Sequence, residues 1–246
     1  MSAAGSGPDA ERNALKRAAA EAAVDLVQDG MVVGLGTGST AAFAIEALAR
    51  RHGQGLRFLG IPTSDRAAAQ ARAGGIPLTS FAAHRRIDLT IDGADEVERS
   101  TLNLIKGLGG ALLHEKIVAA ASRWLVIIVD GAKLVDRLGT RAPVPVEVVA
   151  FGLEPTQAAL ESLGARASLR RSPAGAAFVT DSGNRILDCA FGAIADPARL
   201  EERIRRVVGV VESGLFIGLA HTVLVADEAG VHRLDAPSRR GAARST

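Results

Sequence analysis

Residues 31–40 read MVVGLGTGST, a short apolar run followed by glycines and then by hydroxyl residues. The run at 31–35 is typical of a buried parallel strand, and residues 39–50 have the composition of a helix. The same alternation of strand and helix continues to about residue 130 with short connections. It predicts an α/β fold with a Rossmann-like, mainly parallel sheet and helices on both faces.

The expected elements of this first part alternate along the chain. Helices are predicted at 11–28, 39–50, 64–73 and 111–121, and strands at 31–35, 56–61, 87–91 and 124–129. Ser64 is the expected N-cap of its helix. Asp92 and Asp130 are expected at the ends of their strands, which is the edge of an open α/β sheet where ligands bind.

The pattern changes after about Arg141. Strands are predicted at 144–149, 165–170, 178–180, 185–191 and 210–216, and helices at 155–163 and 196–206. The segments 178–180 and 185–191 form a hairpin-like pair around 181–184, and the whole can be read as the β-α-β-β-α-β order of a ferredoxin-like unit. Strands at 222–226 and 231–234 follow it. The sequence therefore predicts an α/β domain of residues 1–142 and 218–246, with disorder at 1–9 and 237–246, and a smaller inserted ferredoxin-like α+β domain of residues 143–217.

Composition excludes several classes of protein. The 246 residues are 48% apolar and 23% charged with a net charge of +2, as in ordinary globular proteins. Cys189 is the only cysteine, so no intrachain disulfide is possible and a reducing compartment is expected. No secretory signal and no membrane-spanning apolar run is visible. Aromatics are 3% and the arginines are dispersed, which argues against a nucleic-acid platform.

Lysine is rare in this chain. Only four of the 29 basic residues are lysines, at positions 16, 106, 116 and 133. An ammonium is a compact point charge that fits where a guanidinium does not. We therefore expect some of these positions to carry a specific role.

The first glycine-rich loop, Gly34–Thr40, joins a predicted strand to a helix. Glycines let the backbone approach a ligand, and a helix N-terminus favours an anion. Ser39 and Thr40 add hydroxyl groups. The spacing fits neither a P-loop nor a dinucleotide fingerprint. Phosphate binding is favoured over a simple strand–helix turn with a Ser/Thr cap.

Two further motifs carry chemical groups to the same edge of the sheet. DGADE at 92–96 places carboxylates at a strand end, where they could bind either a metal or sugar hydroxyls. No histidine lies nearby to complete a transition-metal site, and the spacing is not that of a calcium-binding loop, so a metal is disfavoured. KGLGGALLHEK at 106–116 is a second glycine loop entering a helix. Glu115 as a base and Lys106 as an oxyanion partner suffice for proton abstraction beside a carbonyl. A solvated helix face is the plainer interpretation of Glu115 and Lys116.

The order of these motifs is more specific than any one of them. GLGTGST (34–40), DGADE (92–96), KGLGGALLHEK (106–116), PVEV (145–148) and FVTDSGNRILD (178–188) follow one another along the chain. Over about Leu15 to Val231 the sequence resembles the type A ribose-5-phosphate isomerase family. The resemblance implies an aldose–ketose isomerase that interconverts D-ribose 5-phosphate and D-ribulose 5-phosphate through an enediolate, in the non-oxidative pentose phosphate pathway, without a metal or organic cofactor.

The resemblance also implies roles for residues. Glu115 would be the base, Asp92 would assist ring opening, and Lys106 with the loop 107–109 would stabilise the oxyanion. The implied substrate-binding residues are Lys16, Thr37, Gly38, Ser39, Thr40, Asp92, Gly93, Ala94, Asp95, Lys106, Gly107, Leu108, Gly109 and Lys133, with Lys133 and Lys16 near the phosphate. The chain departs from the family pattern at Leu108, where glycine is common, and at Ala132, where serine is common.

Two other functions are weighed against the isomerase. A sugar-phosphate sensor would need a DNA-binding helix-turn-helix, for which no segment remains. An acyl- or CoA-transferase-like enzyme would need room for a large nucleotide. We expect a cytoplasmic enzyme that acts on a small-molecule sugar phosphate and has no nucleic-acid or membrane partner. The resemblance implies a homodimer, with a tetramer as the alternative.

Overall fold

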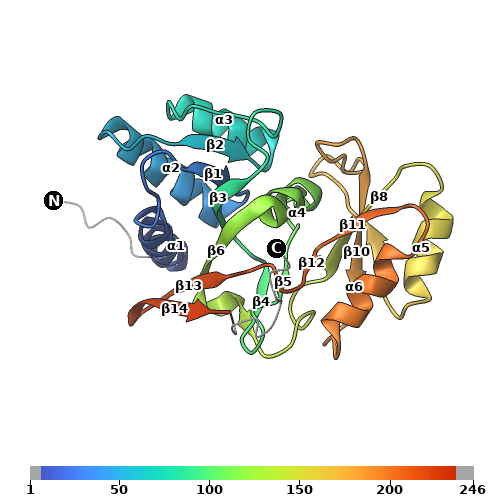
Figure 1. Cartoon of the computed structure of the whole chain (residues 1–246). Coiled ribbons are helices and arrows are strands. Elements are labelled where there is room, and N and C mark those ends of the chain that lie inside the picture. Colours follow the sequence, from blue (N-terminus) through green and yellow to red (C-terminus); the bar gives the residue numbers. More distant parts are fainter. Residues whose placement is uncertain (1–6, 237–246) are drawn as a thin grey trace, which may run out of the picture.

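A computed structural model describes residues 7–236 of the chain. Its central sheet has the strand order β14-β13-β6-β3-β1-β2, in which every neighbouring pair is parallel except β13 with β14 (Figure 1). The strands are β1 (Val32–Leu35), β2 (Leu59–Pro62), β3 (Ile87–Asp92), β6 (Ser122–Asp130), β13 (Thr222–Asp227) and β14 (Gly230–Asp235). The predicted Rossmann-like, mainly parallel sheet is confirmed.

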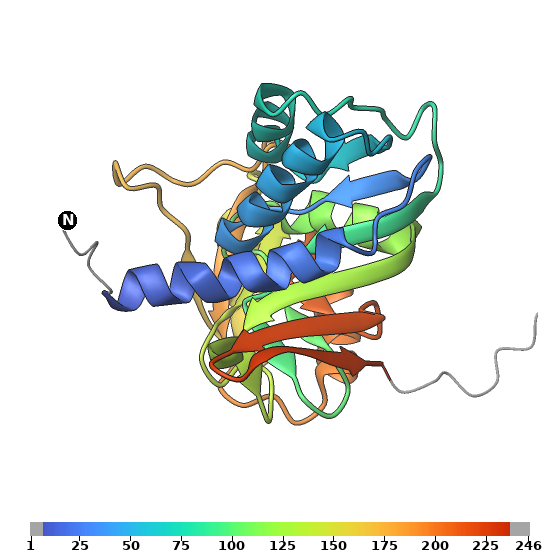
Figure 2. The same ribbon diagram turned by 90° about the vertical axis from the view of Figure 1, so that its left-hand side faces the viewer.

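Helices cover both faces of this sheet, as predicted. One face carries α1 (Pro8–Val24), α2 (Ser39–Gly53) and α3 (Asp65–Ala73), whose alanines and Leu48 pack on Val33. The other face carries α4 (Leu112–Ala121), whose Val118 packs on Val32 and Ile87. Figure 2 shows α1 and α2 lying next to each other on their face of the sheet. None of the described helices is long and apolar enough to cross a membrane.

The first helix differs from the prediction at both ends. It begins at Pro8 rather than at residue 11, so the disorder expected at residues 8 and 9 is wrong; proline is favoured in the first turn of a helix. It ends at Val24 rather than at residue 28. The disorder predicted for residues 1–6 and 237–246 lies outside the described residues.

The described residues form three sheets: the central sheet, the sheet of the ferredoxin-like unit, and a third sheet that was not predicted. The strand order of this third sheet is β12-β5-β4-β7, with β4 (Glu96–Glu98), β5 (Leu104–Ile105), β7 (Leu134–Val135) and β12 (Leu215–Phe216). The strand expected at 210–216 is therefore two strands, β11 (Val210–Ser213) and β12, separated by Gly214. A Cβ at Gly214 would lie 2.2 Å from the carbonyl oxygen of Lys106, so only glycine fits at this crossing. The third sheet thus joins segments from both predicted domains.

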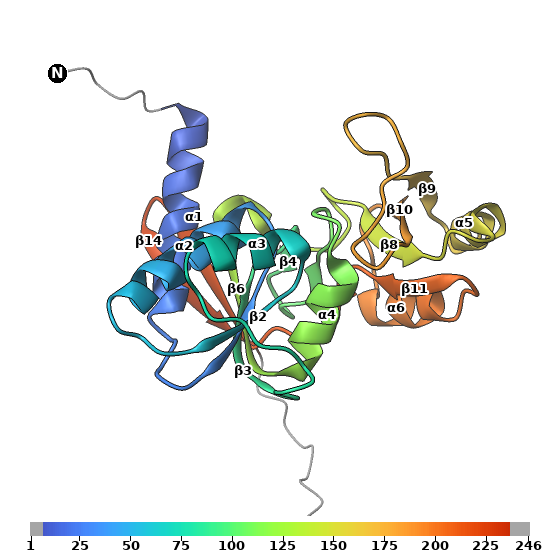
Figure 3. The same cartoon turned by 90° about the horizontal axis from the view of Figure 1, so that it is seen from above.

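The ferredoxin-like unit has the predicted order of elements (Figure 3). These are β8 (Val144–Val148), α5 (Leu153–Glu161), β9 (Arg166–Leu169), β10 (Arg185–Ala190), α6 (Pro197–Arg205) and β11, with the antiparallel sheet order β11-β8-β10-β9. Val146, Leu187 and Ile204 lie in its core. The strand expected at 178–180 is wrong: this segment is a loop, joined to the unit through Phe178 N–H, which donates to the Arg170 carbonyl. The domain limits at 142/143 and 217/218 stay a prediction.

Candidate active site

The loops that follow β1, β3 and β5 meet the start of α4 around one cleft of about 380 Å³. The cleft lies at the carboxyl ends of parallel strands, as the motifs predicted. Its lining holds the following predicted site residues: Lys16, Thr37, Gly38, Ser39, Thr40, Gly93, Ala94, Asp95, Lys106, Gly107, Leu108, Gly109, Glu115 and Lys133. The structure therefore brings together every predicted site residue except Asp92, which lies directly beneath.

Asp92 ends β3 and is buried under the first glycine loop. Its Oδ1 accepts hydrogen bonds from the N–H of Thr37, at 3.1 Å, and of Gly93, at 2.7 Å. This approach explains a glycine in the loop, because a Cβ at Gly36 would lie 2.3 Å from that same oxygen. The carboxylate thus fixes the first glycine loop to the end of the sheet.

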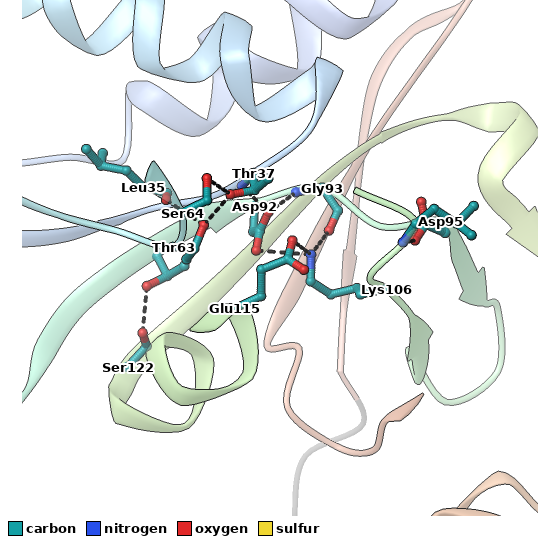
Figure 4. A network of polar contacts seen from close by, with 12 residues as sticks. Leu35, Thr37, Thr63, Ser64, Asp92, Gly93, Asp95, Lys106, Glu115 and Ser122 are labelled. Carbon is teal, nitrogen blue, oxygen red and sulfur yellow. Dashed lines mark hydrogen bonds and ion pairs between the residues drawn. The ribbon is translucent and has the colours of Figure 1, made fainter. Parts of the chain in front are cut away.

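Lys106 lies between two carboxylates (Figure 4). Its Nζ is 3.0 Å from Asp92 Oδ2, 3.0 Å from Glu115 Oε1 and 2.5 Å from the carbonyl oxygen of Gly93. All three charged side chains are at least 95% buried. An ammonium has three N–H donors, so these three acceptors use all of them.

The burial of this cluster shifts its pKa values. Burial raises the pKa of Glu115 to about 8, because the attraction of Lys106 does not fully offset it and the charge of Asp92 adds to it. Burial alone would lower the pKa of Lys106, but Asp92 and Glu115 outweigh it and raise that pKa above its ordinary value. Glu115 is thus a carboxylate whose proton affinity suits acid–base chemistry near neutral pH.

One oxygen of Glu115 is unsatisfied. Oε2 is buried and has no hydrogen-bond partner within residues 7–236, whereas Oε1 is held by Lys106. A buried polar atom without a partner is costly and is most often found where a ligand or a reaction uses it. Glu115 lines the cleft, and Oε2 is its oxygen without a partner.

The second glycine loop, residues 107–109, forms another part of the wall. The Leu108 N–H donates to Asp95 Oδ2 at 2.9 Å, which ties the loop to the DGADE motif. The Leu108 side chain itself is 44% exposed. Leucine is accommodated at this glycine position because its side chain extends towards solvent.

The start of α2 supplies hydroxyls and backbone N–H groups to the cleft. Gly38 is the N-cap and makes no side-chain capping bond, so the first N–H groups of the helix are uncapped by a side chain. Lys16 on α1 donates from Nζ to Ser39 Oγ at 3.0 Å. Lys16 therefore lies where an anion at this helix end would be bound.

Two arginines of the cleft were missed by the sequence analysis. Arg12 lies four residues before Lys16 on α1, so helical spacing would have placed both on one face. Arg141 is positioned by Glu96, a buried carboxylate that accepts hydrogen bonds from the backbone N–H groups of Gly139 (2.6 Å), Arg141 (2.5 Å) and Ala142 (2.8 Å). No sequence signal marked this contact.

The fourth lysine has a separate place. Lys116 follows the candidate base but is not in the cleft wall; its Nζ is 2.8 Å from Glu212 Oε1 on β11. Burial lowers the pKa of Lys116 despite that partner. The solvated helix face considered for Glu115 and Lys116 is wrong, because only 5% and 13% of these side chains are exposed; Lys116 is a structural residue paired with Glu212. Within residues 7–236 no three His, Cys, Asp or Glu side chains are grouped to hold a metal ion.

An α/β cleft with a buried carboxylate of raised pKa, a lysine bound to it and a cationic rim is the arrangement expected of an enzyme that moves a proton on a small anionic substrate. The family model of ribose 5-phosphate isomerase A (phosphoriboisomerase A) matches residues 59–230. The chain belongs to this family.

Individual relatives cover nearly the whole chain. The ribose-5-phosphate isomerase A of Gloeobacter violaceus is 62% identical over 220 residues, which are 89% of this chain and 95% of the relative. The structure of the enzyme from Methanocaldococcus jannaschii has a TM-score of 0.88 and 42% identity, covering 91% of this chain and 99% of that one. A D-ribose-5-phosphate isomerase in complex with phospho-erythronic acid has a TM-score of 0.87 and 38% identity, covering 90% and 98%.

Proposed function

We propose that this cleft interconverts D-ribose 5-phosphate and D-ribulose 5-phosphate through an enediolate. The observation that carries the proposal is Lys106 held between Asp92 and Glu115, with Glu115 Oε2 unpartnered at the cleft. Family membership supports the substrate. So does the relative bound to phospho-erythronic acid, because its planar, negatively charged carboxylate imitates the planar O–C=C–O group of an enediolate.

Glu115 moves the proton in this proposal. Its ionised Oε2 takes the hydrogen from C2 of the open-chain aldose, and the electron pair of that bond forms the C1–C2 double bond while the aldehyde oxygen becomes an oxyanion. Glu115 then returns the proton to C1, and the hydroxyl proton passes from O2 to O1. The product is the 2-ketose, with atoms and electrons balanced and no redox partner.

Lys106 responds to the protonation of Glu115. All three of its N–H donors are in use before the reaction. When Glu115 takes up a proton its attraction for the ammonium falls, and one N–H becomes available to the oxyanion as that charge forms. The proton transfer and the stabilisation of the oxyanion are thereby linked.

The other residues of the site bind and orient substrate. Asp95 accepts sugar hydroxyls as well as the Leu108 N–H, and the Gly109 N–H faces the enediolate oxygens. Asp92 holds Lys106 and the Thr37 peptide; its part in ring opening stays a prediction. The phosphate binds at the start of α2 with Ser39 and Thr40, between cations of α1 and the loop that carries Lys133.

Purified protein treated with EDTA tests the proposal directly. Ribose 5-phosphate is added and the ketose product is followed by ¹H NMR. We expect full conversion to the equilibrium mixture at an undiminished rate. A protein without turnover would contradict the proposed activity, and loss of turnover with EDTA would contradict the metal-free proton transfer.

We further propose that the enzyme acts in the cytoplasm, in the pentose phosphate pathway of carbohydrate metabolism, as a homodimer. Phe151 and Val208, apolar side chains that are 94% and 91% exposed, are candidates for burial in such a contact. Light scattering coupled to size-exclusion chromatography measures the mass, which is 25.4 kDa for one chain.

A further inference from the structure

Arg170 extends from the ferredoxin-like unit to the second glycine loop of the cleft. Its Nη1 donates to the carbonyl oxygens of Gly107, at 2.8 Å, and of Leu108, at 3.1 Å. Arg170 follows β9, so this contact joins residues more than 60 positions apart in the chain. The guanidinium is largely buried, with 12% of the side chain exposed.

Asp188 on β10 holds the other side of the same guanidinium. Arg170 Nε donates to Asp188 Oδ2 at 2.9 Å, and Nη2 donates to Oδ1. The register explains the pairing: Ser168 lies opposite Asp188, so Arg170 is its diagonal neighbour on the same face. A two-point contact with a carboxylate together with two carbonyl contacts needs the planar, five-donor guanidinium, which lysine does not provide.

The contact fixes which way two peptide groups point. In a trans peptide the C=O and the next N–H point in opposite directions. Arg170 binds the Gly107 carbonyl, and the N–H of the same peptide, on Leu108, donates to Asp95 at the cleft. Arg170 also binds the Leu108 carbonyl, which directs the N–H of Gly109 away from Arg170, towards the side on which Gly109 lines the cleft.

A second residue of the small unit presses on the same loop. A Cβ at Gly110 would lie 2.4 Å from the Phe178 ring, so the ring packs directly on the glycine backbone. The Arg170 guanidinium carbon lies 6.0 Å from the centre of that ring. The FVTDSGNRILD segment, which the roles assigned so far do not use, thus supplies both Phe178 and Asp188 to this support.

We infer that Arg170, held by Asp188, is a positioning residue that holds loop 107–109 so that the Leu108 N–H binds Asp95 and the Gly109 N–H is directed towards the enediolate oxygens. This inference rests on the proposed function of loop 107–109. It gives the small unit a part in catalysis: without the guanidinium, the Leu108 carbonyl loses this hydrogen bond, and the Gly107–Leu108 peptide keeps only the Gly110 N–H and Asp95 as partners among the described residues. Loss of the Arg170 contact should weaken stabilisation of the transition state more than binding of the substrate, because the residues proposed to bind phosphate are on α1, α2 and the loop that carries Lys133.

The variants Arg170→Ala, Arg170→Lys and Asp188→Asn test the inference, with Arg206→Ala as the matched control. Arg206 pairs with Glu202 on the exposed side of α6 in the same unit, far from the loop in sequence. We expect Arg170→Ala and Arg170→Lys to lower kcat about 10- to 100-fold, somewhat less than outright loss of an oxyanion-binding donor, with KM changed less than about threefold. Asp188→Asn should lower kcat less, and Arg206→Ala not at all.

A purely structural role would not change ligand discrimination, so inhibition constants complete the test. We expect inhibition by phospho-erythronic acid to weaken in parallel with kcat/KM, while competition by inorganic phosphate is unchanged. Thermal unfolding shows which variants are folded. If Arg170→Ala does not fold, Arg170→Lys and Asp188→Asn are used for the kinetic and inhibition measurements. Folded variants with wild-type kcat, or with equal losses of both inhibitors, would overturn the inference. An inactive wild-type protein would instead overturn the proposed function.

Discussion

Replacing Glu115 with glutamine removes the proposed base and keeps its shape. The amide oxygen can still accept from Lys106 Nζ, which lies 3.0 Å from Glu115 Oε1, while the NH₂ group replaces the unpartnered Oε2. A positioned general base contributes about 10²- to 10⁴-fold to rate. We therefore expect Glu115→Gln to lower kcat by about that factor. KM should change little, because the residues proposed to bind phosphate are on other elements.

The raised pKa of Glu115 also predicts how kcat/KM of the wild-type protein depends on pH. With a pKa of about 8 in the folded protein, the carboxylate is about one-tenth ionised at pH 7 and about nine-tenths ionised at pH 9. The base acts in its ionised form, so kcat/KM should rise about tenfold over that interval and then level off. The substrate phosphate, whose second pKa is about 6, remains dianionic throughout.

Two assays check these expectations. The rate of ketose formation gives kcat and KM, and incorporation of deuterium from D₂O at the reacting carbons reports proton removal followed by exchange with solvent. Glu202→Gln, an exposed carboxylate on α6, is the control for the substitution. Turnover or deuterium exchange near the wild-type level in folded Glu115→Gln, or a flat wild-type profile from pH 7 to pH 9, would refute the reasoning.

Further substitutions probe the fit of the site. Lys106→Arg should lower kcat at least about 10²-fold, because the buried ammonium has no room for a guanidinium; wild-type kinetics would contradict this. Lys133→Arg should mainly raise KM, by about tenfold, and an unchanged KM would count against its contact with phosphate. Gly36→Ala should lower both the melting temperature and kcat/KM, since its Cβ would collide with Asp92. Gly53→Ala, where nothing lies within 4 Å, is its control.

Much of this fold was predictable because its long elements have regular patterns. The apolar strands and the capped helices, such as α3 with Ser64 and α6 with Asp196, carry their own signals. The third sheet does not, since strands such as Leu104–Ile105 are too short for any periodicity. Phenylalanine is enriched in strands, which favoured a strand at Phe178. In the structure this residue is in a loop, and its ring packs on the backbone of Gly110.

The sequence predicted which residues form the candidate site better than it predicted how they contact one another. The motifs could be expected to meet because parallel strands present their carboxyl ends at one edge. That Lys106 is buried between Asp92 and Glu115 depends on β5, which the sequence did not reveal. Arg141 was missed because its position depends on the backbone contacts of Glu96, which have no spacing signal.

Cys189 gives the protein an internal probe of its own opening. The thiol is fully buried on β10, and burial raises its pKa to about 12, so the folded state presents neither an accessible sulfur nor a thiolate. Labelling by an aryl disulfide must therefore proceed through transient exposure of this strand, and its rate reports the opening equilibrium. Asp188 is the neighbouring residue, so the same rate measures how firmly the strand that holds Arg170 stays closed, and how much a bound substrate analogue tightens it.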